Sequence, residues 1–325
     1  MRDLRDIQLR DIQLRDIQKG GPSRRVVLLG AVGVLGLAAC GQPASGAGAG
    51  ATTKAATLSI SAIPDQDPAK LTRLYSLVAT RFTTDTGLQT AYRTVTDYTA
   101  VVRAFEIGDI QLAWMGGLTG VQARSRVPGA LAIAQRDIDA DFHSLFIANT
   151  KSGLAPFTAV EGLKSLAGHS LTFGSQTSTS GRLMPQYFMQ QGGLEVSALT
   201  GQPGYSGSHD ATIEAVASGS FEVGAVNEQV WKSTVAAGKV NLSNVVVLWR
   251  TPGYADYHWL VRPDLDQTHG AGTTAKVTAL LVGLDPAKPD DAAILDLFGA
   301  KRFVPTKNAN YDQIEAVARA QGLLT

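Results

Sequence analysis

Small hydroxyl residues crowd one short stretch of the sequence, TFGSQTSTSGRLMPQYF (residues 172–188), which holds six serines and threonines and two glycines. The pattern predicts a strand that ends here and a helix that begins near Arg182. The first turn of a helix leaves about four backbone N–H groups without helical partners and carries a partial positive charge, so it attracts anions. Ser178, Thr179 and Ser180 would add hydroxyl donors. An anion site is one interpretation, and an ordinary helix cap, which uses the same residue types, is the other.

A second stretch, Ser206-Gly207-Ser208-His209-Asp210, repeats this chemistry before another apolar-periodic helix. His209 falls in the first turn of that helix, where it could donate to an anion or be a satisfied core histidine. Ser208, His209 and Asp210 do not suit a hydrolytic triad, because adjacent side chains cannot line up as nucleophile, base and orienting group. The sequence has neither a G-x-S-x-G elbow nor a P-loop, so we expect neither an enzyme nor a nucleotide site.

The composition favours a small ligand over a metal, a cofactor or a nucleic acid. The only cysteine is Cys40, so the chain can form neither an internal disulfide nor a cysteine cluster for zinc, and its five histidines show no His-x-x-x-His spacing. The net charge of +1 over 325 residues offers no basic surplus for a row of phosphates. A small anion, in contrast, needs only a local group of donors.

The elements that would position these stretches alternate between strand and helix. Apolar runs predict strands at residues 58–63, 92–95, 110–115, 170–173, 221–226, 245–250 and 257–262, most of them followed by a helical pattern. Such alternation predicts parallel, doubly wound sheets. Because the alternating pattern occurs twice along the chain, we expect two α/β lobes with a ligand cleft between them. We expect lobe 1 at 57–147 plus 250–325 and lobe 2 at 148–249, with hinge crossings near 147–149 and 248–251.

The N-terminal segment has the features of an export signal. Residues 4–18 repeat LRDIQ and predict no fold, and Lys19, Arg24 and Arg25 then precede an apolar stretch up to Ala39. That stretch is shorter than the roughly 20 residues that span a bilayer, and it suits a signal peptide. The sequence LAAC, ending at Cys40, resembles a bacterial lipobox. We expect a repeat tail and lipoprotein signal peptide at 1–39, a lipid anchor on Cys40 and a flexible tether at 40–56.

Three motifs, TDYTAVVRAFEIGDIQLAWMGG, TSTSGRLMP and GSHDATIEAV, resemble the phosphate/phosphite/phosphonate-type substrate-binding proteins of ABC transporters. SAIPDQD, WMGGLTGVQARSRVPG, GSQTSTSGRLMP and VGAVNEQVW are most similar to the selenate-binding branch of that family. The resemblance covers most of residues 58–324. It implies a type II periplasmic-binding-protein fold, whose two hinged lobes close on a tetrahedral oxyanion, and it implies ABC permease and ATPase subunits as partners.

The resemblance also assigns roles to residues. It places the oxyanion cup of lobe 2 on residues 178–180, a histidine donor on His209 and a tyrosine from lobe 1 on Tyr98. A second family tyrosine falls on Phe142, which has no hydroxyl, although His143 is adjacent. Aminoalkylphosphonate binders carry carboxylates at positions that here hold Gln229 and Tyr257, which argues against such a ligand. The expected ligand-binding residues are Tyr98, Ser178, Thr179, Ser180, Ser208, His209, Asn227 and Tyr257.

The uncharged donors of lobe 2 favour an unprotonated dianion, so we expect selenate or sulfate first and phosphonate, phosphite or phosphate next. Asp65, Asp67 and Asp256 could instead turn toward the cleft and supply an acceptor. The simpler expectation is that Asp67 caps its helix and Asp65 stays solvated. The chain would then be a monomeric lipoprotein at the outer face of the cytoplasmic membrane. The alternative is a ligand-sensing receptor lobe of a signalling system, which would need a partner domain.

Overall fold

A computed structural model describes residues 56–324 of the chain, which lie within one compact unit, Thr53–Thr325. The expectations for the LRDIQ repeats, the signal peptide, Cys40 and the tether up to residue 55 therefore lie outside the described residues. Between residues 56 and 324, no helix has the length and apolar character needed to cross a bilayer.

Lobe 1 is built on a six-stranded sheet with the strand order β11-β4-β10-β3-β1-β2. The strands are β1 (Leu58–Ala62), β2 (Thr90–Tyr92), β3 (Leu112–Met115), β4 (Leu131–Arg136), β10 (His258–Val261) and β11 (Phe303–Pro305). β1 pairs in parallel with β2 and β3, as predicted. β10 is antiparallel to β3 and β4, and β11 is antiparallel to β4, so the prediction of a parallel sheet is wrong here. β10 and β11 belong to the part of the chain that returns from lobe 2. This part enters the sheet in the direction opposite to its neighbours β3 and β4.

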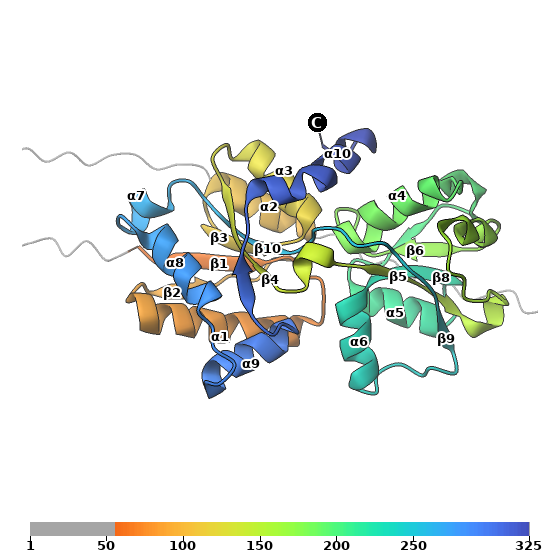
Figure 1. Cartoon of the computed structure of the whole chain (residues 1–325), viewed down its shortest axis with the longest axis horizontal. Coiled ribbons are helices and arrows are strands. Elements are labelled where there is room, and N and C mark those ends of the chain that lie inside the picture. The colour runs from red at the N-terminus through yellow and green to blue at the C-terminus, as the bar shows by residue number, and fades with distance from the viewer. Residues whose placement is uncertain (1–55, 325) are drawn as a thin grey trace, which may run out of the picture. The chain divides into compact units, whose positions relative to one another are not determined.

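Helices cover both faces of this sheet (Figure 1). One face carries α2 (Tyr98–Ile107), α3 (Gly117–Arg126) and α10 (Asp312–Ala320), and the other carries α1 (Pro68–Thr86), α8 (Thr273–Val282) and α9 (Pro289–Phe298), with α7 (Leu265–His269) beside α8. α1 begins where the sequence predicts, because the Asp67 side chain accepts a hydrogen bond from Lys70 N–H and Pro68 is the first helical residue. The predicted capping role of Asp67 is thus confirmed.

Lobe 2 is built on a five-stranded sheet with the order β7-β6-β8-β5-β9. Its strands are β5 (Ser144–Asn149), β6 (Leu171–Phe173), β7 (Gly204–Tyr205), β8 (Val223–Asn227) and β9 (Val245–Arg250). β6 is parallel to β7 and β8, whereas β5 is antiparallel to β8 and β9. The helices are α4 (Met184–Gln191) on one face and α5 (His209–Ala217) and α6 (Glu228–Ala236) on the other (Figure 1). The predicted architecture of two α/β lobes is confirmed.

Two antiparallel chain segments connect the lobes. Phe142 and Tyr254 exchange backbone hydrogen bonds of 2.8 and 3.0 Å, and Thr251 N–H donates to the Ser144 carbonyl at 3.0 Å. All of β5 pairs within the lobe 2 sheet, so the chain enters that lobe at Ser144, earlier than the predicted crossing at 147–149. The apolar residues of β5 continue through residues 145–148 without a break. The sequence pattern therefore does not mark the residue at which the chain enters lobe 2.

Candidate oxyanion site

The hydroxyl-rich stretch forms the edge of lobe 2 that faces lobe 1. It leaves β6 and enters a single π-helical turn, Thr179–Leu183, ahead of α4. Ser178 caps this turn by accepting a hydrogen bond from Gly181 N–H at 2.9 Å. Thr179 Oγ1 accepts a bond of 2.9 Å from Leu118 N–H, at the start of α3 in lobe 1. Ser180 is buried as well. In this cup of residues 178–180, the Ser180 hydroxyl is left open, Ser178 fixes the backbone and Thr179 joins the cup to lobe 1.

His209 is the first residue of α5, where Ser208 is the N-cap and accepts from Ala211 N–H at 3.3 Å. The Nδ1 atom of His209 accepts a hydrogen bond from Asn227 N–H at 3.3 Å, which places the ring proton on Nε2. Burial lowers the pKa of His209 to about 3, so the ring is neutral at physiological pH. His209 therefore offers one N–H donor, at Nε2, and no charge.

Tyr98, the first residue of α2, contributes from lobe 1 and follows the N-cap Asp97. Burial raises its pKa well above the usual value, so its hydroxyl keeps its proton. We call Tyr98 Oη, Ser180 Oγ and His209 Nε2 the open polar atoms. Each is buried and has no hydrogen-bond partner within residues 56–324. Ser178 lies close enough to Tyr98 to oppose part of its pKa shift, but the two side chains do not meet hydrogen-bond geometry. A buried polar atom without a partner costs about 1–3 kcal/mol, so an acceptor bound here would satisfy three predicted site residues at once.

A buried carboxylate from lobe 1 connects to this group of donors. Asp65 is only 3% exposed, so the expectation that it stays solvated is wrong. Its Oδ2 accepts from the Tyr257 hydroxyl at 2.8 Å, and that hydroxyl accepts from Asn227 Nδ2 at 3.0 Å. The Asp65 carbonyl accepts from His209 N–H at 3.0 Å. Burial raises the pKa of Asp65 to about 6, although the bond from Tyr257 opposes the shift.

A second buried carboxylate, Asp256, lies beside the cup. Its Oδ1 accepts a hydrogen bond of 2.9 Å from Gly117 N–H at the start of α3, while Oδ2 has no partner in the described part of the chain. Burial raises the pKa of Asp256 to about 7 despite that bond. A Cβ on Gly116 would lie 3.0 Å from Thr179 Oγ1 and 3.2 Å from Asp256 Oδ1. A glycine at position 116 therefore lets the cup approach Asp256 closely.

The buried cation nearest to this network is already neutralised. Arg136 donates to both carboxylate oxygens of Asp139, at 2.6 and 2.8 Å, and to the Phe298 carbonyl at 2.8 Å. Its guanidinium lies 4.9 Å from the centre of the Tyr257 ring. The groups that can attract an anion to the site are therefore neutral donors and helix ends. Arg136 does not add to them, because its charge is balanced by Asp139. Within residues 56–324, no group of three or more His, Cys, Asp or Glu could hold a metal ion.

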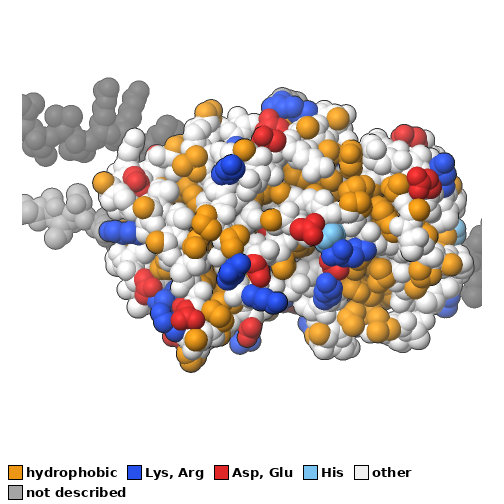
Figure 2. Space-filling model, viewed as in Figure 1, with side chains coloured by type: hydrophobic (Ala, Val, Ile, Leu, Met, Phe, Trp, Pro, Cys, Tyr) orange, Lys and Arg blue, Asp and Glu red, His pale blue; other side chains and the backbone are white. Residues whose placement is uncertain are grey.

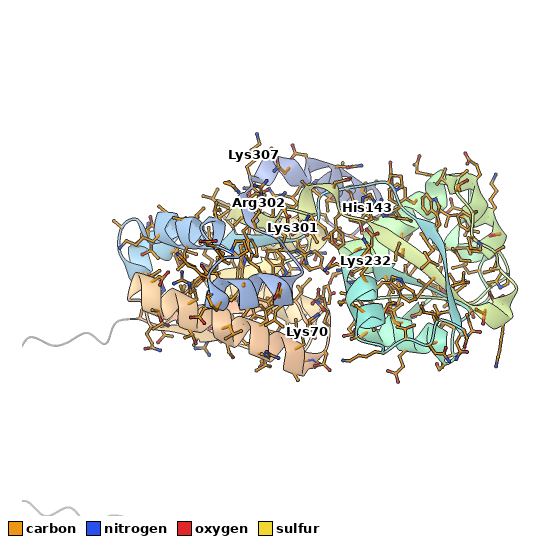
Figure 3. The ribbon with its side chains drawn as sticks, turned by 60° about the horizontal axis from the view of Figure 1, so that its bottom comes forward. Lys70, His143, Lys232, Lys301, Arg302 and Lys307 are labelled. Carbon is orange, nitrogen blue, oxygen red and sulfur yellow. The ribbon has the colours of Figure 1, made fainter. Side chains whose placement is uncertain are left out.

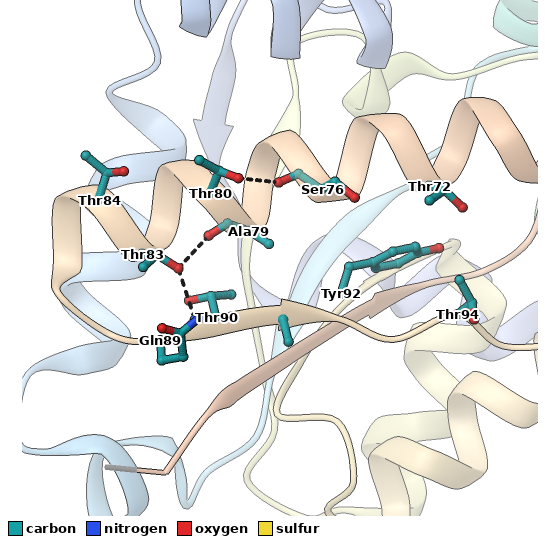
Figure 4. A pocket seen from close by; sticks show the side chains of 11 residues that line it. Thr72, Ser76, Ala79, Thr80, Thr83, Thr84, Gln89, Thr90, Tyr92 and Thr94 are labelled. Carbon is teal, nitrogen blue, oxygen red and sulfur yellow. Dashed lines mark hydrogen bonds between the residues drawn. The ribbon is translucent and has the colours of Figure 1, made fainter. Parts of the chain in front are cut away.

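Hollows lie beside the contact between the lobes and also between α1 and β2. One groove of about 490 Å³ runs between the start of α1 and α5, with Asp67, Ser208 and Asp210 in its lining. Acidic and basic side chains are interspersed on the face shown in Figure 2, and Lys70, His143 and Lys232 lie near the contact between the lobes in Figure 3. Another groove, of about 420 Å³, lies between α1 and β2 and is lined mainly by hydroxyl side chains (Figure 4). None of its lining residues carries an open polar atom.

The comparisons with known proteins decide the family. Residues 60–311 match the family model described as ABC transporter, phosphonate, periplasmic substrate-binding protein. The chain belongs to this family. As a phosphonate-type substrate-binding protein it is a transport protein and not an enzyme, which confirms the expectation from the sequence.

Two relatives and two solved structures illustrate the membership. The chain is 41% identical over 263 residues to the probable ABC transporter phosphite binding protein PhnD1 of Prochlorococcus marinus, with 81% of this chain and 89% of the relative covered. A structure of that PhnD1 in complex with methylphosphonate matches with a TM-score of 0.81 over 82% of this chain and 99% of the other, at 40% identity. A binding protein component of an ABC phosphonate transporter from Pseudomonas aeruginosa shares the fold, with a TM-score of 0.71 over 82% and 86% of the two chains at 18% identity. The phosphonates-binding periplasmic protein of Escherichia coli is 23% identical over 213 residues, which cover 64% of this chain and 60% of the relative.

The structure of this phosphonate-type binding protein separates the predicted site residues into two groups. Tyr98, Ser180 and His209 carry the open polar atoms, and Thr179 binds across the lobes beside them. The other predicted residues are used within the protein: Ser178, Ser208 and Asn227 as helix caps and Tyr257 between Asn227 and Asp65.

Phe142, His143 and Gln229 do not contribute open polar atoms. Phe142 packs its ring against Tyr257, with the ring centres 5.5 Å apart. The Nδ1 atom of the adjacent His143 lies 2.7 Å from the Thr251 carbonyl. Gln229 lies against Gly299 of lobe 1, where a Cβ on the glycine would overlap its amide. The carboxylates of Asp65 and Asp256 therefore matter more to the site than these positions.

Proposed function

We propose that this substrate-binding protein captures a small phosphorus oxyanion, phosphite or methylphosphonate before sulfate or selenate, and delivers it to an ABC permease with its ATPase subunits. The family supports the transport role, and the relative named as a phosphite binding protein and its structure with methylphosphonate support the ligand class. This order of ligands is the reverse of the one that the uncharged residues of lobe 2 suggested from the sequence.

The observation that carries the proposal is the burial of Asp65 and Asp256 beside the open polar atoms. Sulfate and selenate are unprotonated dianions near neutral pH, so an ionised carboxylate in the site repels them. Phosphite and methylphosphonate can carry one proton near neutral pH. A protonated oxygen of such a ligand can donate to a carboxylate while its other oxygens accept from Ser180, His209 and Tyr98. The raised pKa values of the two aspartates also allow a proton to be shared between ligand and protein.

A competition titration tests the proposal. The protein is saturated with one oxyanion, and phosphite, methylphosphonate, phosphate, sulfate and selenate are compared as competitors at pH 6, 7 and 8. We expect phosphite or methylphosphonate to displace the others at the lowest concentration. If sulfate or selenate competes best at all three pH values, the carboxylates do not select the ligand and the proposed ligand class is wrong.

We further propose that the protein is exported and held at the outer face of the membrane by a lipid on Cys40, as a monomer. The lipobox-like LAAC sequence and the Gly/Ala/Ser-rich segment after it support this proposal. Replacing Cys40 with serine should release the protein from membranes or leave it unprocessed. A processed, membrane-bound Cys40→Ser protein would show that the anchor lies elsewhere.

A further inference from the structure

The lobes also meet at the outer end of the cleft, where the start of α1 in lobe 1 faces the start of α5 in lobe 2. There Asp67 N–H donates a hydrogen bond of 2.7 Å to Asp210 Oδ2. Asp67 is the N-cap of the 19-residue helix α1, and Asp210 lies in the first turn of α5. Because the donor and the acceptor belong to different lobes, this bond forms only when the lobes are closed.

The geometry points to Asp210 as a latch residue, which sets how long the lobes stay closed on the oxyanion without touching the oxyanion itself. Its carboxylate takes the backbone N–H at the entry to α1, where the helix end carries a partial positive charge. A carboxylate that accepts such a bond stabilises the closed form over the open form. We expect closure by this route to act on every ligand alike, because the two Asp210 oxygens face Asp67 N–H and the Thr234 hydroxyl.

Charged and polar side chains surround the latch. Lys70, in the first turn of α1, lies at the end of the helix that faces lobe 2 (Figure 3). Burial lowers the pKa of Lys70, and the attraction of Asp65 and Asp210 raises it in part. The Thr234 hydroxyl lies 3.4 Å from the other oxygen of Asp210 and donates at 2.7 Å to the Val230 carbonyl. The carboxylate of Asp67 itself is occupied with Lys70 N–H at 2.9 Å.

The latch is adjacent in sequence to a ligand donor. His209 N–H donates to the Asp65 carbonyl at 3.0 Å, so the first turn of α5 makes two bonds to the segment that leads into α1. When these bonds break, the start of α5 can move away from lobe 1 and carry His209 Nε2 with it. Release of the latch therefore also removes a donor from the anion, which explains how a residue outside the site controls dissociation.

The size of the effect follows from the position of Asp210. It lines the groove of about 490 Å³ between α1 and α5 and is accessible to solvent, so ions screen its charge. A carboxylate at an exposed helix end changes an equilibrium by about two- to fivefold. We expect Asp210→Ala to speed ligand dissociation by about that factor at low salt, and by less at high salt. Asp210→Asn, which keeps an acceptor oxygen but loses the charge, should fall between wild type and Asp210→Ala.

The test measures association and dissociation rates of phosphite and methylphosphonate for the wild type and both variants, at low and high salt. The latch predicts a faster dissociation, an unchanged association rate and an unchanged ratio of the two affinities. Glu214→Ala is the matched control, because Glu214 is an exposed carboxylate on the same helix, on the turn after Asp210. A dissociation rate of Asp210→Ala equal to that of the control would overturn the inference. A change in dissociation rate for only one of the two ligands would overturn the inference, because it would show that Asp210 discriminates between ligands and does not control closure.

This inference rests on the proposed function for its probe ligands, and the two can fail separately. If the wild type binds neither anion, the proposed ligand class is wrong, and the latch is judged from hydrogen exchange at the Asp67 amide. Asp210→Ala should then expose that amide to faster exchange than Glu214→Ala does. Equal exchange in the two variants would overturn the latch as well. Thermal unfolding of both variants checks that lobe structure is retained.

Discussion

The two sides of the cleft use different chemistry. Lobe 2 offers neutral donors that follow strand ends, with Ser180 after β6 and His209 after β7. Lobe 1 offers one hydroxyl, from Tyr98, and two buried carboxylates, Asp65 and Asp256. Neutral donors bind any oxyanion, whereas carboxylates respond to its protonation. On the proposed function, we expect lobe 2 to provide affinity for negative charge and lobe 1 to determine which protonation form of the anion is accepted.

The carboxylate side should give the largest effect, a dependence of affinity on pH. In the closed form burial raises the pKa of Asp256 to about 7 and that of Asp65 to about 6, whereas solvated aspartates titrate near about 3.9. We expect opening of the cleft to expose both carboxylates to solvent, so that the closed form holds more protons than the open form and closure takes up protons. Affinity should be highest at low pH, fall as pH rises through about 4 to 7 and level off above that, by up to about tenfold per pH unit for each proton.

Calorimetry in buffers of different ionisation enthalpy counts the protons taken up on binding. Sulfate, which has no proton of its own to exchange in this range, isolates the contribution of the protein, and methylphosphonate is measured beside it. Asp256→Asn should reduce the uptake, and the exposed Asp109→Asn should leave it as in the wild type. Binding of sulfate without proton uptake between pH 5 and 7 would contradict the role assigned to lobe 1.

The donor side should give a loss of affinity that hardly depends on pH. Ser180→Ala removes one open polar atom, and a hydrogen bond to a charged group contributes about 1.5–3 kcal/mol, so affinity should fall by about tenfold or more. His209→Ala should cost a similar amount, although it also takes away the acceptor of Asn227 N–H. Ser165→Ala, an exposed hydroxyl of the same lobe, is the control. If titration calorimetry finds wild-type affinity in both site variants, lobe 2 does not hold the anion.

The contact between the two sides should be sensitive to one added methyl group. Gly116 has φ −73° and ψ 164°, which alanine adopts without strain, so Gly116→Ala should leave lobe 1 folded. Its Cβ would lie 3.0 Å from Thr179 Oγ1 of lobe 2, which must then move. Overpacking of this kind costs about 1 kcal/mol at its lower end, or about fivefold in affinity. Solution scattering with saturating ligand should show less compaction than in the wild type, and equal compaction would mean that the lobes close without this contact.

Local sequence patterns indicate the residues of the proposed donor side, but they do not indicate the burial of the two carboxylates. Hydroxyls before a helix and a histidine in a first turn are local patterns, so spacing alone singles out Ser180 and His209 as candidates. The burial of Asp65 and Asp256 depends on contacts with residues far away in the sequence, such as Tyr257 and Gly117, and no local pattern reports it. Asp256 follows the hinge and precedes β10, and the antiparallel direction of β10 is likewise fixed by how the chain returns and not by its periodicity.

The same residue types also serve as helix caps, and three residues that the sequence placed at the site have that role in the structure. Ser178, Ser208 and Asn227 all precede a helical turn, and each accepts a hydrogen bond from a backbone N–H of that turn. A cap and a ligand donor have the same sequence signature, because both arise from the unsatisfied N–H groups of a helix start. In the structure Ser208 is half-buried and its hydroxyl is used as a cap, whereas Ser180 is buried and its hydroxyl has no partner among residues 56–324.

The smallest effect on binding should therefore come from Ser208, although it stands next to His209. Its Oγ accepts from Ala211 N–H at 3.3 Å and caps α5, so Ser208→Ala should lower the free energy of unfolding by about 1 kcal/mol. The affinity for methylphosphonate should stay within about twofold of wild type, because a cap of that strength stabilises α5 in the open and closed forms alike. Denaturant unfolding and calorimetry on the same preparation separate the two quantities. Ser208→Gly, a residue tolerated at helix caps, should restore most of the stability. If Ser208→Ala instead lost as much affinity as Ser180→Ala, with unchanged stability, Ser208 would be a ligand donor. The separation of helix caps from ligand donors would then be wrong for this residue.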